Sequence, residues 1–145
     1  MTSQIDKSND FTLMKLSESD QTLADDSADI RGNKVIDKDG QEIGDVNDLL
    51  IDNNEHRVRF LEVGAGGFLG ISEKTFLIPV DAVTRVHDDH VHLGHTSKKI
   101  MDSPDYNPDL IREKRDVSNW EDTYRWYGYP GFWTSGYRYP GFPLV

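Results

Sequence analysis

The stretch EIGDVNDLLIDNNEHRVRFLEVG, residues 42–64, decides the fold because it holds two apolar runs joined by a polar turn. In the first run, residues 42–52, the spacing of three between Ile43 and Val46 interrupts a strict alternation. Such a phase shift predicts a β-bulge near Gly44. In the second run apolar side chains occupy both parities, which is typical of a strand that is buried on both faces or bulged. The stretch therefore predicts two neighbouring strands.

Shorter apolar runs flank this stretch on both sides. They predict strands at residues 34–37, 75–79, 83–87 and 90–93, and a single helical turn at residues 79–83. Six short strands with little room for helices between them are typical of a small closed barrel. The predicted fold class is therefore mainly β, a small six-stranded β-barrel over residues 30–95. Its core is expected to consist of Ile43, Val46, Leu49, Ile51, Val58, Phe60, Leu61, Val63, Leu77, Ile78, Val83, Val86, Val91 and Leu93.

Composition divides the rest of the chain into three segments. Residues 1–29 are acidic and lack repeated apolar spacing, which predicts a disordered tail, with docking of the patch at residues 11–16 as an alternative. Residues 96–127 predict a short helical extension that is interrupted by two prolines. Residues 128–145, the aromatic tail, are rich in proline and glycine.

Aromatic side chains are concentrated near the C-terminal end. Ten of them lie in residues 120–145, and Tyr-Pro-Gly-Phe occurs twice, at residues 129–132 and 139–142. The Pro-Gly pairs predict two type II turns. So many aromatic rings favour packing on a barrel, either the chain's own or a neighbour's, and the second arrangement gives a homodimer. The residues expected to make this interaction are Trp120, Tyr124, Trp126, Tyr127, Phe132, Trp133, Tyr137, Tyr139 and Phe142.

Composition and charge exclude several classes of protein. Only 36% of the chain is hydrophobic, and no run approaches the ~20 apolar residues that a membrane-spanning helix needs. No apolar signal sequence is recognisable, so we expect a cytoplasmic protein. The lack of cysteine excludes disulfides and thiolate chemistry. A formal net charge of -10 disfavours binding to nucleic acid or to an anionic membrane surface.

Two patterns resemble binding sites. His87, His90 and His92 could approach one zinc or nickel ion across a hairpin, but strand alternation alone places them on a solvent-facing side, and we favour that interpretation. The glycine-rich residues 64–70 resemble a dinucleotide loop, but another strand follows where the phosphate-binding helix is needed. No catalytic triad or carboxylate pair is recognisable. We therefore predict no enzyme, with no catalytic residues, no cofactor and no metal ion.

The ordered series of motifs in the barrel region resembles the PRC-barrel domain family. The resemblance lies in IRGNKV (30–35), DGQEIGDVNDLLID (39–52), VRFLEV (58–63), GGFLG (66–70) and FLIPVDAV (76–83). Two later stretches, SPDY (103–106) and WEDTYRWYG (120–128), resemble the tail that follows such barrels in soluble bacterial members.

The resemblance implies a six-stranded barrel that binds other macromolecules and carries no catalytic residues of its own. The family includes the cytoplasmic domain of the photosynthetic reaction-centre H subunit and the C-terminal domain of a ribosome maturation factor. Within these residues we expect neither the membrane-anchoring helix of the first nor the second barrel of the other. Our main hypothesis is a protein–protein interaction or assembly module that binds itself and an unidentified protein. The alternatives are an H-subunit-like auxiliary of a photosynthetic complex and a ribosome maturation or RNA-processing factor.

Overall fold

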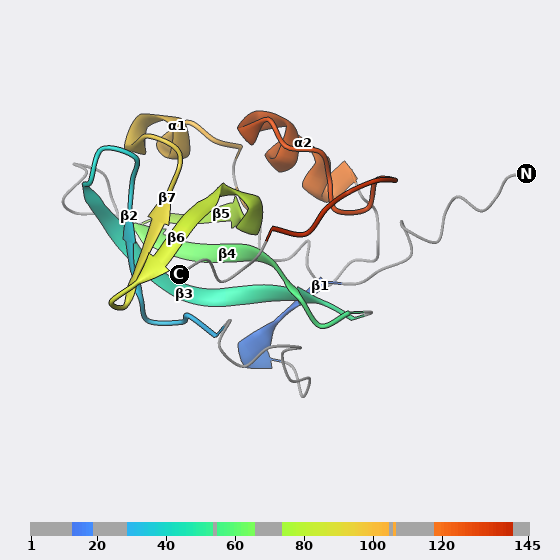
Figure 1. Ribbon diagram of the computed structural model, residues 1–145, viewed down its shortest axis with the longest axis horizontal. Coiled ribbons are helices and arrows are strands. Elements are labelled where there is room, and N and C mark those ends of the chain that lie inside the picture. The colour runs from blue at the N-terminus through green and yellow to red at the C-terminus, as the bar shows by residue number, and fades with distance from the viewer. Residues whose placement is uncertain are drawn as a thin grey trace, which may run out of the picture.

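The computed structural model describes residues 13–18, 29–53, 55–65, 74–104, 106 and 118–140. In these residues seven strands form one strongly twisted sheet, with the order β5-β4-β3-β2-β7-β6 and with β1 paired to β3 (Figure 1). The strands are β1 (Leu13–Lys15), β2 (Lys34–Ile36), β3 (Glu42–Asp52), β4 (Val58–Ala65), β5 (Lys74–Pro79), β6 (Val83–His87) and β7 (His90–Leu93). The helical elements are the 3-10 turns η2 (Leu16–Glu18) and η4 (Val80–Ala82), and the helices α1 (Ser97–Met101) and α2 (Ser118–Tyr127). The mainly β fold class is confirmed.

β3 and β4 form the long central pair of the sheet, and both carry bulges. Val35 of β2 faces Gly44 whereas Ile36 faces Glu42, so Ile43 is the extra residue of a bulge beside Gly44, as predicted. A second bulge puts Arg59 between the pairs Leu50–Phe60 and Ile51–Val58. All of β4 except one half-buried glycine is buried. Its apolar runs therefore contribute to packing on both faces of the sheet.

The sheet is not closed into a continuous hydrogen-bonded barrel. In the described residues β5 and β6 are the two ends of the strand order, and they are joined directly through η4. Pro79 ends β5, and a proline has no N–H to donate to a further strand pair. The prediction of a closed six-stranded barrel is therefore wrong in this detail, because the seam between β5 and β6 stays open among the described residues.

β1 adds a seventh strand that comes from the acidic N-terminal part of the chain. It pairs antiparallel with Leu50–Asp52 of β3, beyond the end of β2. Leu13 and Leu16 are buried on either side of this short pairing. Residues 13–18 therefore follow the docked alternative and not the unattached tail.

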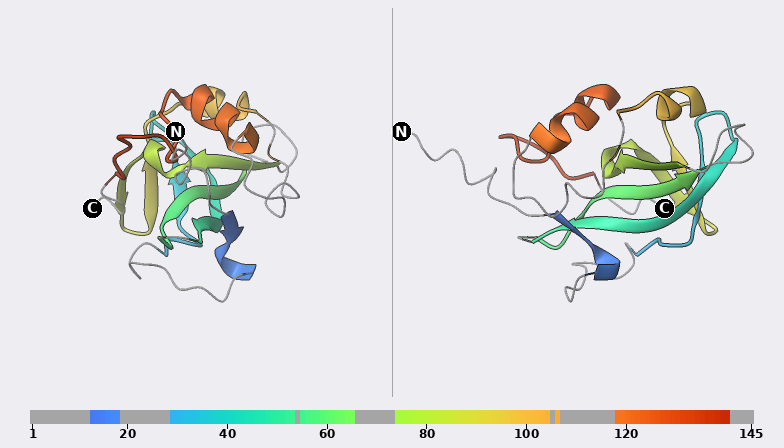
Figure 2. Two further views of the ribbon diagram at one scale, coloured as in Figure 1. Left: turned by 90° about the vertical axis from the view of Figure 1, so that its right-hand side faces the viewer. Right: turned by 180° about the vertical axis from the view of Figure 1, so that it is seen from behind.

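Two apolar clusters hold the sheet and the helices together. The larger cluster fills the concave interior, with Leu49, Leu61 and Ile78 fully buried. The smaller one lies on the other face, where α2 covers β4 and β5 (Figure 2). Every residue of the predicted core is buried in one cluster or the other. None of the helices in the described ranges is long and apolar enough to cross a membrane.

Candidate protein-interaction site

The aromatic residues of α2 pack on the chain's own sheet. The ring of Phe60 in β4 lies 5.6 Å from that of Trp120 and 5.3 Å from that of Tyr124, measured between centroids. Trp133 closes this group, with its ring 5.3 Å from Tyr124. Tyr127 is buried in the interior cluster. These four residues of the predicted interaction set therefore form part of the protein's own core.

The turns of the aromatic tail differ from the predicted ones. Gly131 does not have the positive φ that a type II turn requires after Pro130. The backbone turns instead at residues 131–134 and 134–137, where the Tyr137 N–H donates to Thr134 O at 3.2 Å. Gly131 is needed for space, because a Cβ there would lie 2.4 Å from the Trp133 ring. Gly141 and Phe142 of the second predicted turn lie outside the described residues.

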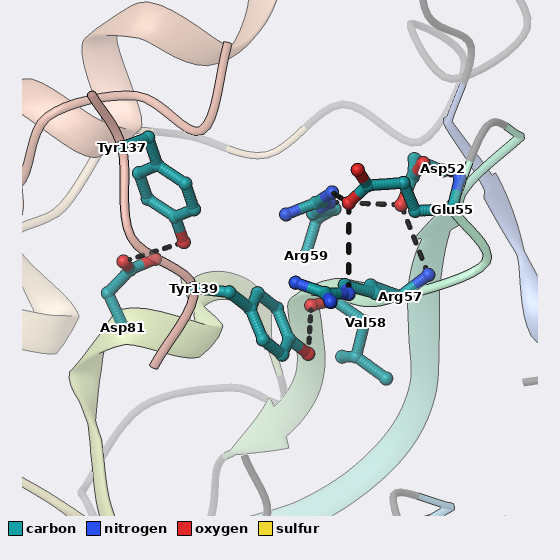
Figure 3. A network of polar contacts seen from close by, with 8 residues as sticks. All are labelled: Asp52, Glu55, Arg57, Val58, Arg59, Asp81, Tyr137 and Tyr139. Atoms are coloured by element: carbon teal, nitrogen blue, oxygen red, sulfur yellow. Dashed lines mark hydrogen bonds and ion pairs between the residues drawn. The ribbon is translucent and has the colours of Figure 1, made fainter. Parts of the chain in front are cut away.

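Arg59 is buried at the bulge of β4 and carries the charge of this site. Its Nε donates to Asp52 Oδ1 at 3.0 Å and its Nη2 to Glu55 Oε1 at 2.9 Å (Figure 3). The guanidinium plane also lies over the ring of Phe132, 4.5 Å from its centroid, and 5.4 Å from that of Tyr139. Because Asp52 is also buried, the pair has good hydrogen bonds in a site from which water is excluded. Arg59 thus links β3 and β4 to the tail.

Tyr139 and Tyr137 fix the tail at two further points. The hydroxyl of Tyr139 donates to Val58 O at 3.0 Å, and the Arg57 guanidinium lies 4.6 Å from the centre of its ring. Burial raises the pKa of Tyr139 to about 12. The hydroxyl of Tyr137 donates to Asp81 Oδ2 at 2.9 Å, as Figure 3 shows. Both residues are half-buried, so part of each side chain stays accessible to solvent.

Asp81 is a carboxylate with incomplete hydrogen bonding. Within the described residues its buried Oδ1 and the buried hydroxyl of Tyr124 make no hydrogen bond of normal geometry, although the two groups lie close enough to interact. Burial raises the pKa of Asp81, although the hydrogen bond from Tyr137 and the charge of Arg59 act in the opposite direction. Burial, together with the Asp81 charge, also raises the pKa of Tyr124.

We expect Asp81→Asn to stabilise the protein at pH 7, by about 1 kcal/mol, the size of one net hydrogen bond. An amide carries no buried charge, can still accept from Tyr137, and can donate toward Tyr124. Because the folded-state pKa of Asp81 is raised, protonation of this carboxyl stabilises the folded protein. The stabilisation is complete below the unfolded-state pKa of 3.8 and is lost as pH rises through the folded-state pKa. The difference between variant and wild type should therefore shrink as pH falls toward 4.

Thermal melting between pH 4 and 8 measures this difference. Asp89→Asn, in the exposed turn between β6 and β7, is the matched control and should not change the pH profile. A variant at Asp81 that melts below wild type at pH 7 would show that the ionised carboxylate is the favoured form.

The three half-buried rings of Phe132, Tyr137 and Tyr139 form what we call the aromatic face. All three surround the buried Arg59 or its neighbour Asp81. The exposed Arg57 lies at the same place. This combination of aromatic rings and arginine is typical of the central part of a protein–protein interface. Trp126 of α2 lies apart from the aromatic face. It packs against α1, where its Nε1 donates to Lys99 O at 2.9 Å.

The histidines of the β6–β7 hairpin come together only in pairs. His87 faces His90 across the hairpin, and the rings of His90 and His92 are 6.4 Å apart between centroids. His90 Nδ1 lies 2.7 Å from the carbonyl oxygen of Asp88. Among the described residues no three histidine or acidic side chains are placed to hold one metal ion. That the protein binds no metal stays a prediction.

His95 has a structural role that the sequence did not indicate. Its Nε2 lies 2.8 Å from the Tyr129 hydroxyl, and its ring contacts that of Tyr127 edge-on at 5.0 Å. Burial lowers the pKa of His95, and the charges of Lys99 and Lys38 lower it further. A single histidine after a strand gives no local signal for this contact. The glycine-rich residues 66–70 lie outside the described part of the chain.

The family model described as PRC-barrel domain matches residues 24–97, which include β2 to β7 and the start of α1. The match covers half of the chain and ends before α2 and the aromatic face.

Proposed function

The chain belongs to the PRC-barrel domain family, and from this premise we propose that it is a non-catalytic, cytoplasmic interaction module that binds other proteins, including a second copy of itself, through its aromatic face. The domain supplies a stable sheet. The tail that follows it supplies the surface that a partner contacts.

One observation carries this proposal: the half-exposed rings of the aromatic face are held in place before any partner binds. Tyr137 and Tyr139 are each fixed by a hydrogen bond through the hydroxyl, and Phe132 lies against Arg59. Rigid side chains lose little conformational entropy on binding, so more of the contact energy contributes to affinity. Tyrosine and arginine are also the residues in which binding energy is most often concentrated.

Self-association follows from the same surface. A two-fold dimer uses the same patch on both copies, and flat aromatic rings pack well on one another. The buried rings of α2 are already used within the chain, so among the described residues of the tail it is the aromatic face that a second copy can reach.

The family also suggests two narrower roles. An auxiliary of a photosynthetic complex is favoured by a gene neighbourhood that contains reaction-centre genes, and a ribosome maturation factor by co-sedimentation with ribosomal subunits. The formal net charge of -10 disfavours the second role, because RNA binding gains much of its affinity from basic side chains. Both roles stay secondary to the general interaction module.

Photocrosslinking at the aromatic face tests the proposal. A chain with p-benzoylphenylalanine in place of Phe132 should give a discrete crosslinked product in cells, whereas the same group in place of Arg85 on β6 should not. A self-complex has twice the chain mass of 16.6 kDa, and another mass identifies a different protein. Equal, diffuse labelling from both positions, together with a monomer in sedimentation, would rule out this face as an interface.

A further inference from the structure

The edge of β3 next to β1 has the features of a peptide-binding groove that the chain fills with its own N-terminal segment. We propose that residues 48–52 of β3, with Glu62 of β4, form a strand-addition groove for an extended, basic, leucine-containing segment of a partner protein. In this proposal Leu13–Glu18 occupies the groove as an intramolecular mimic of that segment. The inference rests on the proposed interaction function and adds to it a second surface, a partner chemistry and a means of regulation.

The two leucines of the segment enter different apolar clusters. Leu13 joins Leu50 and Phe60 in the cluster under α2, whereas Leu16 joins Leu49 in the interior cluster. Between them the backbone of β1 pairs with β3 in antiparallel register. Main-chain pairing with side chains in separate pockets is the usual geometry of strand addition to a sheet edge.

The groove is acidic, and the segment supplies the complementary groups. Asp48 and Glu62 are paired across β3 and β4, and both are buried, which places two carboxylates side by side. Like charges directly opposite each other destabilise a strand pair. Lys15 Nζ lies 3.2 Å from Glu62 Oε1, and Ser17 donates to Asp48 from both its N–H and its hydroxyl. The Tyr106 hydroxyl also donates to Glu62 Oε1 at 3.1 Å, so a cation from the occupant adds to this hydrogen bond, and a hydroxyl from the occupant pairs with Asp48.

The segment is a small addition to the sheet and can be exchanged. β1 has only three residues, and ten residues of sequence separate Glu18 from Asp29. A tethered segment of this kind acts at an effective concentration of about millimolar. A partner segment with the same pattern and a better fit will therefore displace it at lower concentration.

The pattern that the groove selects is read from these contacts. It has an apolar residue at the first position, a basic residue at the third, a second apolar residue at the fourth and a hydroxyl at the fifth, as in Leu13–Ser17. Glu62 selects the basic residue at the third position. An acidic residue at that position would add a third negative charge beside the carboxylates of Asp48 and Glu62.

The test uses the full chain and a fluorescent peptide of residues 11–20. Leu13→Asp with Leu16→Asp empties the groove within the chain. The peptide should bind this variant at least about tenfold more tightly than it binds wild type, in which the tethered segment competes. A control variant, Thr84→Asp with Gln41→Asp, adds the same charge at exposed positions and should bind as wild type does. A Lys15→Glu peptide should lose at least about tenfold in affinity for the emptied groove.

Three results would overturn the proposal: equal binding to all three chains, no binding to the emptied variant up to millimolar peptide, or equal binding of the Lys15→Glu peptide. A wild-type dimer that the double variant converts to a monomer would instead identify the occupant as the segment of a second copy. If the double variant does not fold, Lys15→Glu in the chain replaces it, with the same ranking expected. Because only purified components are used, failure here leaves the crosslinking result at Phe132 standing.

Discussion

A chain that ends at residue 118 is expected to lose most of its stability, with a melting temperature lowered by at least about 10 °C. The deletion uncovers Phe60, Leu50 and Leu77, which are almost fully buried under Trp120 and its neighbours. Removal of one large buried aromatic residue costs about 3–5 kcal/mol, and this deletion removes several. A shift of 1 kcal/mol changes the melting temperature of a chain of this size by about 2–8 °C.

Thermal melting of the truncated chain measures whether residues 119–145 stabilise the sheet. Sedimentation measures whether they hold a dimer together. Arg138→Ser, an exposed change in the same segment, is the control and should melt as wild type does. Lower stability with an unchanged oligomeric state would place the tail on its own sheet and remove the aromatic face from any dimer. If midpoint and oligomeric state both stay the same, the tail has neither role and is a docking segment for another protein.

Phe60→Ala should lower the free energy of unfolding by roughly 3–5 kcal/mol, because a fully buried ring is lost and a cavity is left. The cavity lies between β4 and α2, where Trp120 and Tyr124 contact the ring. Denaturant unfolding gives the value. Phe132→Ala removes a ring that is only half-buried and should cost about 1–2 kcal/mol. A loss below about 1 kcal/mol for Phe60 would contradict the packing of α2 on the sheet.

The deletion of residues 119–145 and the change Phe60→Ala act on one cluster, so their losses of stability should not be additive. Once residues 119–145 are absent, Phe60 is no longer covered, and its replacement should cost clearly less than in the full chain. Additive losses would mean that Phe60 gains its stabilisation from the sheet alone.

Six of the seven described strands, the bulge beside Gly44 and the β6–β7 hairpin could be predicted from the sequence. Their signals are local: the spacing between Ile43 and Val46, and a turn at Asp88-Asp89, where both residues have a positive φ. The predicted core was correct for the same reason, since alternation along a strand states which side chains face inward. The prediction that aromatic residues near the C-terminal end pack on the β domain is correct, but composition did not indicate whether the chain's own domain or a neighbour's is used.

The sequence by itself thus determined the family, the strands β2 to β7 and the core residues of those strands, because neighbouring residues carry that information. Tertiary structure alone decided what covers them. It placed Tyr139 on Val58, 81 positions away, and Ser17 on Asp48, 31 positions away. It also buried Arg59 through a bulge, and it used Gly131 for space beside an indole ring where a positive φ was expected. These contacts join segments far apart in the chain, so their geometry depends on how the whole sheet twists and on no local pattern.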